Sequence, residues 1–104
     1  MTRDELRDEL RYLSQTLIDL ENNEENRYKF FTKALNLLKE GMASGAINDY
    51  ELICDKRNNT QEVIDDGRFV CDVKYSSEGM NYTLGLVVAN QGVDSTELPV
   101  EEYL

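Results

Sequence analysis

The stretch that decides the fold lies at residues 68–75, which read RFVCDVKY. Its apolar side chains recur at every second position, at Phe69, Cys71, Val73 and Tyr75, and most of the residues between them are charged. Successive side chains of a strand point to opposite faces of the sheet, so this alternation predicts a strand with one buried face.

Two further stretches have the same period of two. Residues 49–56 alternate around Leu52, and residues 81–89 alternate around Leu84 and Leu86. The polar run at residues 76–79, SSEG, predicts a tight turn between neighbouring strands. We therefore expect strands at about 49–56, 67–75 and 81–89 in a small, mainly antiparallel sheet of three or more strands.

Before Gly45 the period is helical. Leucines recur at spacings of four and three from Leu6 to Leu20, which predicts a helix at about residues 3–20. That leucine stripe would pack either on the next helix or on a helix of a partner. A second helix is expected at about residues 24–44, with an apolar face broad enough to cover a sheet. The sequence thus predicts an α+β fold, two helices on one sheet, as a single domain over residues 1–90.

The last part of the chain, residues 91–104, contains four acidic residues and no basic one. We expect it to form an extended acidic arm, either a disordered terminus or an arm that orders on a neighbour by strand addition. Its apolar side chains are candidate partner contacts, and acidic residues of the first helix would meet a basic patch on the partner. The candidate partner-binding residues are Leu98, Val100, Tyr103, Leu104, Asp4, Glu5, Asp8 and Glu9.

Composition excludes several classes of function. The 104 residues carry 21 acidic and 11 basic side chains, for a net charge of −10, which disfavours binding to nucleic acid or to an anionic membrane. The sequence has no histidine, the commonest general base and metal ligand. We expect no enzyme activity, no cofactor and no metal. Cys54 and Cys71 are interpreted as buried free thiols, with a disulfide or a metal site as alternatives.

Four motifs occur in order along the chain. Residues 20–27 read LENNEENR, and a long predicted helix then ends between Gly41 and Ile47. Residues 50–65 contain a cysteine-aspartate pair, an asparagine-threonine pair and an isoleucine-aspartate pair, and residues 67–74 read GRFVCDVK. In this order and spacing, the chain resembles the C-terminal, inner domain of contractile phage tail sheath proteins, here as a free-standing short version.

The resemblance implies a structural role. In that family the inner domain lies against the tail tube, and terminal arms join neighbouring subunits by adding strands to their sheets. We therefore expect a virion structural protein that joins or caps the sheath at the neck or baseplate, as a homo-oligomeric ring. Its expected partners are the tail sheath protein, the tail tube or a neck or baseplate protein, and it would pass through the host cytoplasm during assembly. The rival hypothesis is a soluble acidic phage protein that binds and inhibits a basic host protein.

Overall fold

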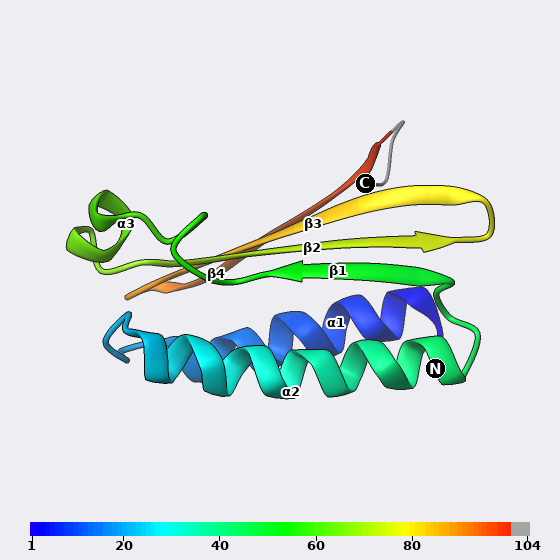
Figure 1. Ribbon diagram of the computed structural model, residues 1–104, viewed down its shortest axis with the longest axis horizontal. Helices are drawn as coiled ribbons and strands as arrows, with labels where there is room; N and C mark the ends of the chain where they lie inside the picture. The colour runs from blue at the N-terminus through cyan, green and yellow to red at the C-terminus, as the bar shows by residue number, and fades with distance from the viewer. Residues whose placement is uncertain (101–104) are drawn as a thin grey trace.

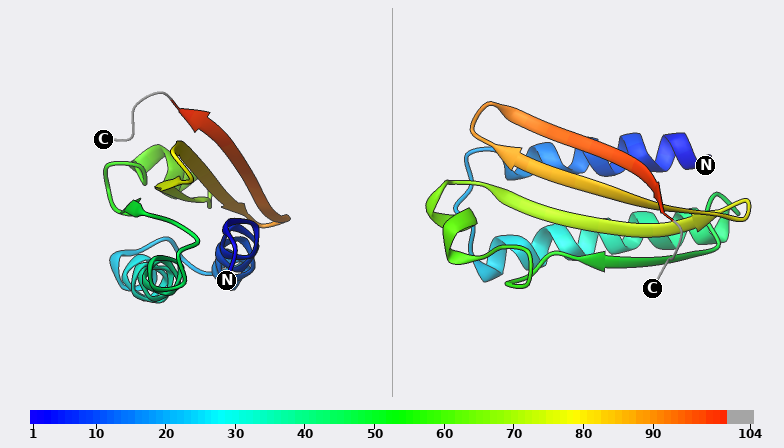
Figure 2. Two further views of the ribbon diagram at one scale, coloured as in Figure 1. Left: turned by 90° about the vertical axis from the view of Figure 1, so that its right-hand side faces the viewer. Right: turned by 90° about the horizontal axis from the view of Figure 1, so that it is seen from above.

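The computed structural model describes residues 1–100. Two long helices lie side by side against one face of a four-stranded antiparallel sheet, in which each strand pairs with the next along the chain (Figure 1 and Figure 2). The elements follow in this order: α1 (Arg3–Ser14), η1 (Gln15–Leu17), α2 (Glu24–Ala43), β1 (Asp49–Ile53), α3 (Gln61–Asp65), β2 (Phe69–Ser77), β3 (Met80–Ala89) and β4 (Gly92–Val100). The α+β class is confirmed.

The core fills the layer between the helices and the sheet. From the helices it takes Leu6, Leu10, Phe30, Ala34 and Leu38, all at most 2% exposed. From the sheet it takes the alternating residues of β2 and β3, which include Phe69, Cys71, Val73, Tyr75, Leu84, Leu86 and Val88. Gly41 lets the two helices approach, because a Cβ added there would lie 2.9 Å from Cδ2 of Leu6.

Local sequence signals account for the ends of the helices. Thr2 caps α1 in a capping box with Glu5, and the Asn23 side chain accepts a hydrogen bond from the amide of Asn26 at the start of α2. Gly45, with φ of +80°, follows α2 in the left-handed conformation that glycine favours.

Two predicted boundaries are wrong. The first α-helix ends at Ser14 and continues only as the short 3₁₀ helix η1, so Leu20 is 47% exposed and outside the helix. The strand predicted for residues 49–56 ends at Ile53, and the loop after it contains the short helix α3, capped by Thr60. The strands predicted at 67–75 and 81–89 are present within two residues of their predicted bounds.

The extended C-terminal arm predicted for residues 91–104 is not confirmed. Residues 92–100 form β4, which pairs antiparallel with β3 along its whole length. Because Asn90 and Gln91 alone connect the two strands, bringing them together costs little loop-closure entropy. Residues 101–104, the remainder of the predicted arm, lie outside the described residues.

Candidate interaction surface

The outer edge of β4 is the most extensive unpaired backbone in the described part of the chain. The sheet order β1-β2-β3-β4 places β4 at one border, and residues 1–100 contain no strand beyond it. An edge strand offers a row of unpaired N–H and C=O groups to any strand that approaches.

The register shows which groups of β4 face outward. Glu78 and Gly79 both have positive φ, as a type I′ turn requires, so Ser77 and Met80 close the β2–β3 hairpin as a hydrogen-bonded pair. Hydrogen-bonded and non-bonded pairs alternate along antiparallel strands. The even-numbered residues of β3 therefore bond β2, and its odd-numbered residues bond the even-numbered residues 92–100 of β4.

By the same alternation, residues 93, 95, 97 and 99 of β4 direct their backbone groups away from the sheet. Pro99 has no N–H, and in this register it removes a donor from the open edge and none from the β3–β4 ladder. Val93, Ser95 and Glu97 keep both a donor and an acceptor there. The open edge thus presents the amides of three residues, at every second position of the strand, to a partner.

The opposite border of the sheet, formed by β1, is less suited to pairing with a partner strand. β1 has five residues, and the register directs the backbone of only Tyr50 and Leu52 outward. The Tyr50 amide already donates to Oδ1 of Asp49 at 2.9 Å. A partner strand would therefore find one free amide at β1 and three at β4.

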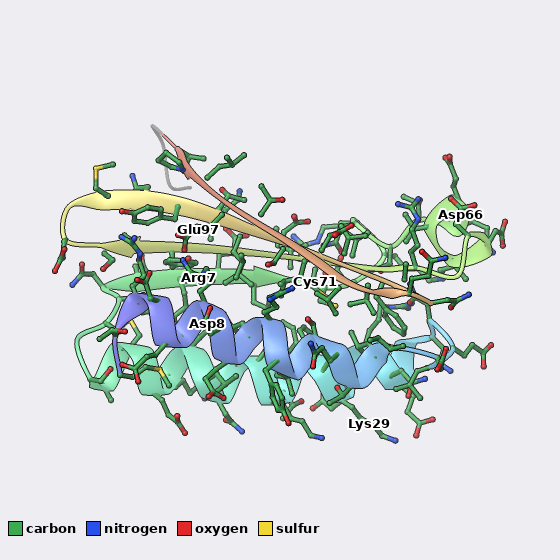
Figure 3. The ribbon with its side chains drawn as sticks, turned by 180° about the vertical axis from the view of Figure 1, so that it is seen from behind. Arg7, Asp8, Lys29, Asp66, Cys71 and Glu97 are labelled. Atoms are coloured by element: carbon green, nitrogen blue, oxygen red, sulfur yellow. The ribbon has the colours of Figure 1, made fainter. Side chains whose placement is uncertain are left out.

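A cluster of charged and aromatic side chains ties β4 to α1. The Glu97 carboxylate, whose side chain is 14% exposed, accepts a hydrogen bond from the Tyr75 hydroxyl and lies 3.7 Å from the Arg7 guanidinium (Figure 3). Close by, Arg3 stacks over the Tyr82 ring at 4.2 Å from its centroid. The contact of Glu97 with Arg7 anchors the edge strand to the first helix, and the contact of Arg3 with Tyr82 anchors β3 to the same helix.

Arg7 also connects β4 to the acidic start of α1. It lies 3.3 Å from both Asp4 and Asp8 and is therefore shared by three carboxylates. Desolvation alone would lower the pKa of Arg7, but Asp8, Asp4 and Glu97 together raise it. The side chains of Asp4 and Asp8 remain 66% and 70% exposed, so they form an anionic rim beside the open edge.

The predicted partner-binding residues fall into three groups. Leu98, 58% exposed, and Val100 lie on β4 itself, so they belong to the edge strand and not to a free arm. Glu5 is exposed, but its carboxylate accepts from the Thr2 amide, and Glu9 is exposed on α1. Tyr103 and Leu104 lie outside the described residues. The sequence interpretation missed the ladder register and the roles of Arg7 and Tyr75.

The asparagines of the quoted motifs have structural roles. The Asn59 side chain, 1% exposed, accepts from the Val70 amide and donates to the Val70 carbonyl, both at 2.8 Å. It thus pairs with β2 as a strand residue would, in the region where β1 has already ended. Asn22 donates to Asn59 at 3.0 Å, which joins the first motif to the third.

Cys54 and Cys71 are free and buried, and within residues 1–100 nothing supports the alternative interpretation of these cysteines as a metal site. Cys71 is 1% exposed, and its hydrogen bond with Cys54, together with burial, raises the pKa of its thiol. No group of three candidate metal ligands occurs within the described chain. Its helices also include none with the length and apolar character of a bilayer span.

The comparison with curated proteins found a relative. The chain is 37% identical over 79 residues to the tail sheath protein of Enterobacteria phage T4, in an alignment that covers 74% of this chain and 12% of that protein. This chain thus spans only a small part of the length of its relative. No family model and no solved structure matches the sequence. The alignment supports a relationship between this chain and part of a tail sheath protein.

Proposed function

We propose that this protein is a structural component of a contractile phage tail, a sheath-like subunit that joins or caps the sheath at the neck or baseplate. The observation that carries the proposal is the open edge of β4 in a chain related to part of a tail sheath protein. The partner would be the tail sheath protein itself or a tube, neck or baseplate protein. The subunits would form a homo-oligomeric ring in the virion tail, after assembly in the host cytoplasm.

The proposed mechanism is strand addition at β4. A partner strand would pair with the amides and carbonyls of Val93, Ser95 and Glu97, and each bond would contribute about 1 kcal/mol net. Backbone pairing of this kind tolerates many partner sequences, so the flanking charges must provide the selectivity. The exposed carboxylates of Asp4 and Asp8 favour a partner with a basic patch next to its added strand.

The difference between the two borders of the sheet supports the proposed capping role. A subunit that propagates a lattice needs two complementary surfaces, whereas this sheet has one long open edge and one short edge whose first outward amide is already bonded. Addition at β4 alone would attach the subunit to the end of an assembly. The growth of that assembly would then stop at this subunit.

The test combines location with a backbone variant. Purified particles should contain the protein at a small fixed copy number, measured by quantitative mass spectrometry, whereas an inhibitor of a host protein would remain in the infected cytoplasm. Ser95→Pro removes an outward amide, and Ser95→Ala is the matched control because it keeps that amide. We expect Ser95→Pro to lose co-purification with the sheath and Ser95→Ala to retain it. Absence from particles, or equal retention of both variants, would contradict the proposal.

A further inference from the structure

A pocket of about 560 Å³ opens between the first turns of α2 and the loop that follows β1. Tyr28 and Phe31 of α2 and Cys54 of the loop provide its apolar walls. Tyr28 is 69% exposed at the rim, whereas Cys54 is buried. None of these residues belongs to the β4 edge, so the pocket is a second, separate surface.

Arg27 of α2 lines this pocket and is only 5% exposed. Its Nη1 donates to Oδ1 of Asn22 at 2.6 Å, a neutral acceptor. Within residues 1–100, no carboxylate lies within 4.0 Å of its guanidinium. Asp55 interacts with this cation electrostatically but forms no direct ion pair with it. A buried cation that lacks a direct ion pair is costly, and it favours binding of an anion that enters the pocket.

Of the two acidic residues that line the pocket, Asp55 already forms an ion pair. Asp55 accepts from Arg57 at 2.7 and 3.0 Å, and this side-chain hydrogen bond is the main reason why the pKa of Asp55 is lowered. Lys56 and Arg57 add two more cations to the lining, against Asp55 and Glu24. In a chain with a net charge of −10, the lining of this pocket carries a local excess of positive charge and includes aromatic walls.

We propose that this pocket binds an acidic, aromatic peptide segment, and that its occupant is residues 101–104 of a second copy of this chain. Those residues read EEYL. Their carboxylates complement Arg27 and Lys56, and the tyrosine and leucine complement the walls formed by Tyr28 and Phe31. The contact is made by side chains and does not use backbone pairing at a sheet edge.

The fold favours a second copy over the same chain. Val100 pairs with Asn81, which lies opposite Ser76 of β2, whereas Ile53 beside the pocket pairs with Asp72. Four residues along a strand and three strand spacings place the pocket about 20 Å from Val100. Four residues span at most about 14 Å, so the segment of the same chain falls short of the pocket. Residues 101–104, called the tail segment below, and the pocket are therefore separate surfaces, and a contact between them on two copies is head-to-tail.

The experiment is sedimentation-velocity centrifugation of the full chain over a wide range of concentration under reducing conditions. The tail variant carries Glu101→Gln, Glu102→Gln and Tyr103→Ser, and the pocket variant carries Arg27→Gln. Tyr28→Ser is a second pocket variant, whose exposed position spares the fold if Arg27→Gln unfolds the protein. Lys29→Gln, a charge loss on the same helix outside the pocket lining, is the control.

We expect the unaltered chain and Lys29→Gln to associate as concentration rises. The tail and pocket variants should each associate about tenfold more weakly or not at all, as expected for the loss of a charge-assisted contact. A mixture of the two should form dimers that grow no further, because only one intact tail–pocket pair remains. A monomeric unaltered chain, a tail variant that associates normally, or a mixture without dimers would overturn the proposal.

A further variant separates this inference from the proposed function. Ser95→Pro changes the β4 edge only, so it should leave the association through the pocket intact. If Ser95→Pro abolishes association while the pocket variants retain it, the copies associate through β4, and the pocket proposal is wrong. If the pocket variants lose association while sheath binding persists, the pocket proposal stands independently of strand addition.

Discussion

The register of β4 predicts that proline is much more destabilising at one of two adjacent positions than at the other. The Thr96 amide bonds the carbonyl of Gly85, whereas the Ser95 amide faces outward. Thr96→Pro would remove one ladder hydrogen bond, worth about 1 kcal/mol net, and leave the Gly85 carbonyl without its partner, at a further cost of about 1–3 kcal/mol. Ser95→Pro would remove no bond within the sheet, and the reduced entropy of the unfolded chain would offset part of any strain.

Urea unfolding followed by circular dichroism measures this difference directly. Ser95→Ala and Thr96→Ala serve as references, so the loss of each side chain is subtracted. Relative to its reference, Thr96→Pro should lower the free energy of unfolding by about 2–4 kcal/mol, and Ser95→Pro by about 1 kcal/mol or less. The larger loss would be a substantial part of the whole stability of a domain, typically about 5–15 kcal/mol. Equal losses at both positions, or a larger loss at Ser95, would refute the assigned register.

Three other predictions follow from buried or ion-paired groups. Asn59→Ala should lower the free energy of unfolding by about 3 kcal/mol or more, measured by urea unfolding, because both backbone groups of Val70 lose their partner; a loss below about 1 kcal/mol would contradict the assigned role. The pKa of Asp55 is lowered in the folded state, so its stabilising contribution is present above the ordinary value of 3.8 and is lost as the pH falls through the lowered folded value. The stability deficit of Asp55→Asn should thus be present at neutral pH and disappear in strong acid, and a deficit that persists there would argue against the ion pair. Cys71, which does not line the pocket beside α2, should react with a thiol reagent only at the rate of unfolding, as monitored by absorbance, and rapid reaction of both thiols in the native protein would contradict its burial.

The sequence alone was sufficient to predict the central strands and the helix layer. Phe69 to Tyr75 alternate so regularly that only one face of β2 can be buried, and all four apolar residues of that face are at most 2% exposed. Leu6 and Leu10 likewise predicted the buried face of α1. Leu20 was misleading because leucine spacing does not reveal where a helix ends. The left-handed Asp19, with φ of +68°, lies in the connection that follows η1.

The candidate site was less predictable because it depends on which strands pair and in which register. The acidic composition of residues 91–104 and Pro99 favoured an arm, although the turn at Asn90 and Gln91 directly after a clear strand was a hairpin signal. Pro99 is compatible with β4 because its missing amide would have faced outward. Arg27 gave no sequence signal, since only the folded chain shows that this arginine is buried and that no carboxylate of residues 1–100 forms an ion pair with it.

Residue-resolved amide hydrogen exchange, of the free protein and of the protein bound to purified tail sheath, tests strand addition at β4 most directly. In the free protein the amides of Val93, Ser95 and Glu97 should exchange rapidly, whereas those of Asp94 and Thr96, which bond β3, should be protected. Binding should protect the first three and leave the other two as they were. A bound complex in which Val93, Ser95 and Glu97 exchange as fast as in the free protein would contradict strand addition.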